Sequence, residues 1–308
     1  MKTVLLKENI HPELSQYVTV KQMGNITDIR YCAINRGCAI RKLDNTNYVN
    51  MVTGEVKAFE PHKKRTDDKS SILQSLKRLR ELINSNVTDS QKCKWLTLTY
   101  AENMRDTLQL YEDFKKFNAR LRYWLLRNNL PSYEYIAVAE PQKRGAWHWH
   151  CFLIFHIAAP YIHYDVIAQT WGHGAIKIKA LRDIDNVGAY LTPYLTDVSL
   201  SDGIFDGDIK NGIRETEEID QHGSKVKKAY IKGARLKLYP AGFRLYRASR
   251  GIKRPIVFVC TEEEALRLVG AAILKYEKTI KLCDEASGKV INIINYRQYN
   301  SRSIEINS

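Results

Sequence analysis

The chain has 308 residues, 44% of them hydrophobic, so it is long enough to bury one large core or two smaller ones. Lysine and arginine outnumber aspartate and glutamate by 48 to 34, and the formal charge of +14 at pH 7 points to nucleic acid as a partner. The sequence lacks a run of about 18 apolar residues and any CxxC pair. We therefore expect a soluble, cytoplasmic protein with reduced thiols, and neither a membrane protein nor a disulfide scaffold.

The first part of the chain predicts short strands followed by one helix. Residues 28–34, 38–43 and 48–52 are β-prone runs separated by turns that contain Asn and Gly. Apolar residues then recur at helical spacing from 71 to 84, with basic residues on the opposite side. We expect residues 1–90 to lie at the periphery of the fold.

The next segment predicts a strand, a long helix and a short helix. Residues 93–100 alternate and are rich in threonine and aromatic side chains, which favours a strand. Asp106, with Gln109 three positions later, resembles a capping box, and the apolar stripe that follows predicts a helix over 107–128. Residues 164–171 predict the short helix.

A β-hairpin with a candidate metal site is predicted from two adjacent strands, 133–140 and 147–155. Because side chains alternate along a strand, His148 and His150 share one face, with Cα atoms roughly 7 Å apart. Glu140 lies at the closing end of the hairpin, where it can complete a third ligand. Two histidines and a carboxylate leave positions open on a divalent cation, as a Lewis-acid site requires. The alternative is that the histidines pack in the core and the glutamate is a surface carboxylate.

A helix that starts after Asp183 or Asp185 carries two tyrosines that a metal site can use. Tyr190 and Tyr194 are four positions apart, so both phenols project from one helix face. A phenol polarised near a cation can attack a phosphodiester and form a covalent ester. The alternative is an ordinary packing pair. The acidic, Gly-rich stretch that follows, within residues 198–230, predicts a long surface insertion.

The C-terminal part, residues 231–308, is expected to contact DNA. Between 232 and 254 there are eight Lys or Arg residues and no acidic residue. Arginine and lysine can neutralise phosphates and aromatic rings can stack on unpaired bases; the alternative is a solvated loop with its aromatics in the core. A capping box at Thr261 predicts a helix to about Thr279. The candidate DNA-binding residues are Arg244, Arg247, Arg250, Lys253, Arg254, Tyr239, Phe243 and Tyr246.

Three motifs, in this order and at these distances, resemble those of HUH endonucleases. They are Thr-Leu-Thr-Tyr at 97–100, Glu140 followed by His148-x-His150, and Tyr190-x3-Tyr194. The chain looks most like the rolling-circle replication initiators of bacterial plasmids, phages and integrative elements. The likeness is carried by residues 93–197, and residues 244–255 also resemble a stretch found downstream of the nuclease core in such initiators.

The resemblance implies an α/β (α+β) fold with a central antiparallel sheet flanked by helices. Residues 91–197 would form the HUH, ferredoxin-like nuclease core, with the C-terminal region appended. It implies that Glu140 and the two histidines hold Mg²⁺ or Mn²⁺ while Tyr190 or Tyr194 attacks the scissile phosphate. The products would be a 5′-phosphotyrosyl DNA and a free 3′-OH that primes synthesis.

The resemblance also implies the partners of the protein. They are single-stranded or supercoiled origin DNA and the host replication machinery. A host helicase is expected as well, because the sequence contains no GxxxxGK[ST] P-loop.

Two positions depart from the family pattern. Initiators with paired tyrosines usually carry a lysine three residues after each tyrosine, where this chain has Pro193 and Asp197. The proline disfavours helical dihedrals at the preceding residue, so the two tyrosines are expected on either side of a kink. Either another cation replaces the lysines or the activity is weak. Tyr190 is the preferred nucleophile and Tyr194 the alternative.

Other functions stay open on the sequence alone. A relaxase or a single-strand transposase would use the same chemistry. A zinc hydrolase with a His₂Glu site would cut without a covalent DNA intermediate. A basic DNA-binding regulator with structural histidines would not cut at all.

Overall fold

We analysed a computed structural model of the chain. It describes residues 2–34, 40–44, 46–51, 53–58, 69–142, 145–179, 181, 187–188, 198–199, 213–219, 225–231, 239–240 and 243–302. The chain divides into a terminal unit, Met1–His62 with Pro255–Ser308, and a central unit, Lys63–Arg254. Among the described helices, none combines the length and the apolar character that a membrane crossing requires.

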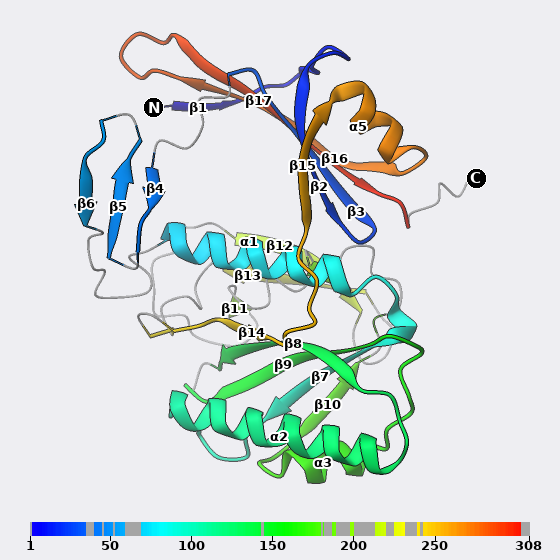
Figure 1. The fold of residues 1–308 in the computed structure, drawn as a ribbon. Coiled ribbons are helices and arrows are strands. Elements are labelled where there is room, and N and C mark those ends of the chain that lie inside the picture. The colour runs from blue at the N-terminus through cyan, green and yellow to red at the C-terminus, as the bar shows by residue number, and fades with distance from the viewer. Residues whose placement is uncertain are drawn as a thin grey trace. The chain divides into compact units, whose positions relative to one another are not determined.

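The central unit is built on a five-stranded antiparallel sheet with the strand order β10-β7-β9-β8-β14. Figure 1 shows helix α1 on one side of this sheet and helices α2 and α3 on the other. The predicted mixed α+β class with a central antiparallel sheet is confirmed, and β9, which carries both histidines, is the middle strand. The elements are α1 (Lys69–Asn86), β7 (Cys93–Thr99), α2 (Thr107–Arg127), β8 (Tyr133–Pro141), β9 (Trp147–Phe155), α3 (Tyr164–Trp171), β10 (Ile176–Lys179) and β14 (Tyr246–Ala248).

Helix α2 covers one face of the sheet because its apolar positions repeat at helical spacing. Asp106 caps the helix by accepting hydrogen bonds from the backbone N–H groups two and three positions later. The Gln109 side chain donates to Asp113 on the next turn, which departs from the predicted capping box. The ring of Phe114 lies 4.7 Å from that of Trp149 on β9, measured between centroids. The buried stripe consists of Leu110, Phe114, Phe117, Leu121 and Leu125.

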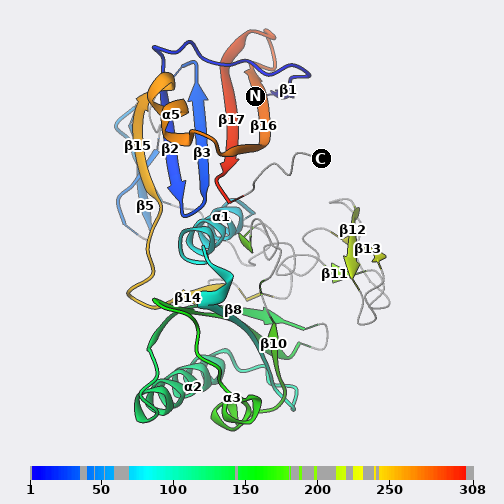
Figure 2. The same ribbon diagram turned by 90° about the vertical axis from the view of Figure 1, so that its right-hand side faces the viewer.

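The terminal unit contains a six-stranded antiparallel sheet with the order β1-β16-β17-β3-β2-β15. Helix α5 packs against one face of this sheet (Figure 2), where Ala265 meets Val18, Val20 and Ile29. The elements are β1 (Lys2–Leu5), β2 (Tyr17–Met23), β3 (Ile26–Cys32), β15 (Ile256–Thr261), α5 (Glu262–Val269), β16 (Ile273–Cys283) and β17 (Val290–Asn300). A separate three-stranded sheet consists of β4 (Ile40–Lys42), β5 (Asn47–Asn50) and β6 (Val56–Ala58).

This division differs from the boundaries predicted from the sequence. The strands beyond residue 255 pair with β1, β2 and β3, so the two ends of the chain build one sheet. Helix α1, expected at the periphery with residues 1–90, belongs to the central unit. Strand β14, assigned by sequence to the C-terminal region, extends the central sheet by pairing with β8.

The helix predicted from Thr261 to about Thr279 is wrong beyond Val269. The capping box itself is confirmed, because the side chains of Thr261 and Glu264 each accept a hydrogen bond from the other residue's backbone N–H. Gly270, with φ of 54°, ends the helix. Strand β16 then pairs with β17 over its whole length.

The stretch 198–230, predicted as an aperiodic insertion, contains strands in its described part. They are β11 (Val198–Ser199), β12 (Ile213–Ile219) and β13 (Lys225–Ile231). All pair antiparallel in the order β11-β13-β12. The stretch is therefore a small sheet with its connections.

A buried ion pair ties α5 to β17 in the terminal unit. The side chains of Arg297 and Glu262 are 2% and 3% exposed, and Nη2 lies 2.7 Å from Oε2. A second contact joins Nη1 to Oε1, so the guanidinium and the carboxylate meet through two parallel hydrogen bonds. Removing one partner would leave a buried charge without compensation.

We predict that Glu262→Ala lowers the free energy of unfolding by about 3–5 kcal/mol, the cost expected for breaking a buried pair. The matched control is Glu263→Ala, which removes an exposed pair with Arg267 on the same helix. That change should cost less than about 1 kcal/mol. Urea denaturation of the full chain, followed by circular dichroism, measures both. Equal losses in the two variants would contradict a structural role for the buried pair.

Candidate metal centre

Strand register brings the predicted ligands together on one face of the central sheet. Glu140 on β8 lies directly opposite His148 on β9. On the other side of β9, strand β7 places Thr97 opposite His150. Directly opposed residues share a face, so these four side chains lie on the same side of the sheet. Trp149 and its alternate neighbours point to the other face, under α2.

The ligand atoms of Glu140, His148 and His150 lie within 4.8 Å of one another. His148 Nε2 lies 3.1 Å from Glu140 Oε2, and His150 Nε2 contacts the same oxygen. Atoms bound to one metal ion at about 2.1 Å lie roughly 3–4 Å apart, so small side-chain adjustments suffice for a common ion. The predicted cluster therefore exists in the structure and fits a divalent cation.

Burial favours the protonation state in which His150 binds metal. The two histidine side chains are 14% and 15% exposed and the Glu140 side chain 6%. Burial, reinforced by the nearby charges of His148 and Lys179, lowers the pKa of His150 to about 3. The imidazole is then neutral at physiological pH, as metal coordination requires.

Thr97 holds the second nitrogen of the His150 ring. Its Oγ1 lies 3.2 Å from His150 Nδ1, which leaves Nε2 directed at Glu140. Such a contact fixes the orientation of a ligating imidazole. The sequence singled out 97–100 only as part of a motif, and the cross-strand register gives this threonine a specific task.

Two lysines that sequence reasoning missed lie on the same face. Strand β10 places Lys177 opposite Thr97 and Lys179 opposite Trp95. The Nζ of Lys179 lies 4.8 Å from the centroid of the Trp95 ring, which in turn is 6.2 Å from the ring of His150. The alternation Ile-Lys-Ile-Lys at 176–179 predicted the strand, but not which strand it pairs with.

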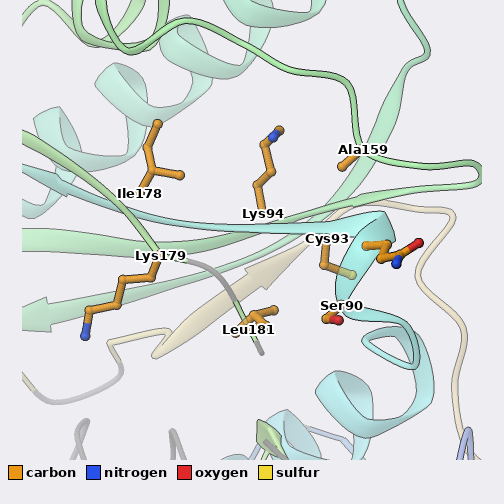
Figure 3. A pocket seen from close by; sticks show the side chains of 8 residues that line it. Ser90, Cys93, Lys94, Ala159, Ile178, Lys179 and Leu181 are labelled. Atoms are coloured by element: carbon orange, nitrogen blue, oxygen red, sulfur yellow. The ribbon is translucent and has the colours of Figure 1, made fainter. Parts of the chain in front are cut away.

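A separate pocket of about 260 Å³ opens at the edge formed by β7 and β10. Its lining includes Lys94 and Lys179 (Figure 3). The two ammonium groups point away from each other in Figure 3, so their charges do not converge on one ligand. None of the three ligand residues lines this pocket. We therefore place the candidate chemistry at the ligand cluster.

The predicted base-stacking role of Tyr239 and Phe243 has to be revised. Their exposed fractions are only 4% and 7%, and the Phe243 ring stacks on Trp147 at a centroid distance of 4.6 Å. Tyr239 also donates a hydrogen bond to the carbonyl oxygen of Ala139. Both rings belong to the core, because the chain around them closes over the end of the β8–β9 hairpin.

The other candidate DNA-binding residues occupy two settings. Tyr246 lies opposite Val138, on the face that carries the ligand cluster. The Arg247 guanidinium lies 3.8 Å from the ring centroid of Tyr111, so it packs on the α2 side. The remaining four are exposed, namely Arg244, Arg250, Lys253 and Arg254.

Tyr190, Tyr194, Pro193 and Asp197 lie outside the described residues. The described residues just before them, Val187 and Gly188, are buried. The Gly188 N–H donates to Asn84 Oδ1 on α1 at 3.1 Å, and a Cβ on Gly188 would lie only 2.6 Å from that oxygen. Residues 187–188 therefore contact α1, the helix on the same side of the sheet as the ligand cluster.

We predict that Thr97→Val weakens Mn²⁺ binding about 10–100-fold, because the isosteric change removes the hydroxyl that orients His150. Thr97→Ser retains the hydroxyl and should bind within a few-fold of the wild type. Isothermal titration calorimetry with MnCl₂ measures both variants. Wild-type affinity in the valine variant would remove this threonine from the account.

The comparisons with known proteins agree with the geometry. No curated protein and no solved structure matched the chain. Residues 93–199 match a family model described as replication-associated protein ORF2. The matched segment contains β7, the hairpin with the ligand cluster, and the segment that carries both tyrosines. We conclude that residues 93–199 form a region of this replication-associated protein family, in agreement with the resemblance to replication initiators.

Proposed function

We propose that this protein initiates rolling-circle replication by nicking one DNA strand with a metal-activated tyrosine. The observation that carries the proposal is the convergence of Glu140, His148 and His150 on one sheet face, inside the segment that matches the replication-associated family. The formal charge of +14 supports DNA as the substrate.

The donor set indicates which cation the site would take. Carboxylate oxygens suit Mg²⁺ and Mn²⁺, and two imidazoles favour Mn²⁺. A cation bound there would supply Lewis acidity to a phosphodiester oxygen. Thr97 would keep His150 in its ligating orientation, and Glu140 would balance part of the positive charge.

Tyr190 or Tyr194 would act as the nucleophile. A bond forms between the phenolic oxygen and phosphorus, the bond from phosphorus to the 3′ oxygen breaks, and the phenolic proton ends on that oxygen. The free 3′-OH primes synthesis, and the phosphotyrosyl bond retains the energy needed to rejoin strands. We favour Tyr190 because it is two residues from Gly188, which contacts α1 on the side of the cluster.

Lys177 and Lys179 would supply the positive charge that Pro193 and Asp197 do not. Both lie on the cluster face by register. In this role they would attract the backbone of the DNA strand toward the scissile position. Origin DNA would be the partner, with a host helicase unwinding the duplex.

A second candidate is a hydrolase, since two histidines and a glutamate are also the ligand set of some zinc hydrolases. In that case a bound water would attack and the tyrosines would be dispensable. A relaxase or a single-strand transposase would share the tyrosine chemistry and differ only in the DNA that is cut.

We predict that the full chain forms an SDS-resistant adduct with labelled single-stranded DNA from its own element when Mn²⁺ is present. Tyr190→Phe should abolish the adduct if Tyr190 is the primary nucleophile, and Tyr194→Phe should then retain it. The matched control is Tyr123→Phe on α2, at an exposed tyrosine away from the cluster. Denaturing gel electrophoresis is the readout.

The alternatives give different gels. Cutting without an adduct, unchanged when both tyrosines are phenylalanine, would identify the hydrolase. Binding with no cutting in any divalent metal would identify a DNA-binding regulator. Either result would overturn the proposed nickase.

A further inference from the structure

The six-stranded sheet of the terminal unit has one covered face and one exposed face. Helix α5 and the segment around residues 10 and 11 cover the first face. There the backbone N–H of Ile10 donates to Thr279 Oγ1 at 3.0 Å, and His11 lies 3.4 Å from Glu277. The alternate residues of the same strands form the exposed face.

Two cross-strand rows make up the exposed face. The register of β16, β17, β3, β2 and β15 aligns each row across five strands. The rows would span roughly 19 Å at ordinary strand spacing and lie about 7 Å apart along the strands. The first row consists of Lys278, Tyr296, Arg30, Thr19 and Val259, and the second of Tyr276, Gln298, Asp28, Lys21 and Val257.

Aromatic and cationic side chains alternate at one end of these rows. The Nζ of Lys278 lies 5.7 Å from the ring centroid of Tyr276 and 5.5 Å from that of Tyr296. Tyr276 is 50% exposed, and Arg30, next to Tyr296 in its row, is also exposed. The rings are thus reachable from solvent and flanked by positive charge.

The charge balance of the face is positive. Lys21, Arg30 and Lys278 are basic, and Asp28 is the acidic residue in the two rows. The Asp28 carboxylate accepts a hydrogen bond from Gln298 at 2.8 Å. A second copy of this face would bring like charges together, which disfavours self-association. A polyanion with flat apolar groups fits it better.

We propose that this exposed face, defined by Tyr276, Tyr296, Lys278, Arg30 and Lys21, binds single-stranded DNA. Unpaired bases would stack on the two tyrosine rings, and the basic residues would neutralise the backbone phosphates. Proteins that bind single strands without strong sequence preference combine these two elements, stacking rings and a positively charged track. The inference does not depend on the metal cluster or on Tyr190 and Tyr194.

The test measures binding of the full chain to a fluorescein-labelled oligothymidylate by fluorescence anisotropy, with EDTA present so that no strand is cut. Tyr276→Ala and Tyr296→Ala should each weaken binding about tenfold, the effect of losing one base–aromatic stack. Tyr276→Phe keeps the ring and should bind like the wild type. Tyr123→Ala, at an exposed tyrosine of α2, is the matched control and should also bind like the wild type.

The charge on the face is tested separately with Lys278→Gln. If Lys278 contacts one phosphate, the slope of log K against log salt should fall by about 0.7. Circular dichroism melting shows whether each variant is folded. Wild-type affinity in both alanine variants, or an equal loss in Tyr276→Phe, would overturn the proposal. Altered sedimentation of the alanine variants with unchanged DNA affinity would overturn it in favour of a protein partner.

The proposal and the nickase can fail independently. The double variant Tyr190→Phe/Tyr194→Phe should lose the covalent adduct and bind oligothymidylate like the wild type. Tyr276→Ala should still form the adduct at saturating protein concentration. Loss of oligothymidylate binding in the double variant would overturn the assignment to the terminal unit.

Discussion

The pairing register between β8 and β9 decides which side chains meet on the face of the cluster. A slip of one residue would turn Glu140 or the two histidines to the opposite side of the sheet. The turn helps to fix the register, because Gly145 adopts φ of 85° and the backbone N–H of Gln142 donates to the carbonyl of Ala146 at 2.7 Å. The buried face of β9 holds it as well, since Trp149 fits under α2 in one register only.

The same alternation separates chemistry from packing along β9. The odd-numbered residues from Trp147 to Phe155 are buried in the core, whereas His148 and His150 stay partly exposed. The core therefore fixes the backbone, and the backbone fixes the spacing of the ligands. Burial then keeps His150 neutral, and Thr97 from the neighbouring strand sets the direction of its ring. The site depends on three strands, although its ligands come from two.

Local patterns predicted the central part of the fold well. The strands 133–140 and 147–155, the helix from Asp106 and the capping box at Thr261 each have a short-range physical cause, and the structure contains all of them. The ligand cluster was predictable for the same reason, because one hairpin supplies it. A helix was wrongly predicted over 273–279, where β-branched and aromatic residues fit a strand once a partner is available.

Features that depend on distant pairing could not be predicted. No local pattern indicates that β17 pairs with β3, or that Phe243 stacks on Trp147 in the core. The lysines of β10 were visible as a strand, but their place beside Thr97 follows only from the sheet order. The exposed face of the terminal unit likewise combines residues from both ends of the chain. Sheet partners far apart in sequence are set by tertiary packing, so single-sequence reasoning misses them.

The chemical identity of the cut end tests the central claim most directly. The full chain would be reacted with Mn²⁺ and single-stranded DNA from its own element, digested with nuclease and trypsin, and analysed by mass spectrometry. The account predicts a nucleotide joined through its 5′ phosphate to the peptide that contains Tyr190 or Tyr194, and its absence when EDTA is added. A cut strand with a free 5′ phosphate and unmodified tyrosine peptides would contradict the account, because water would then be the attacking group.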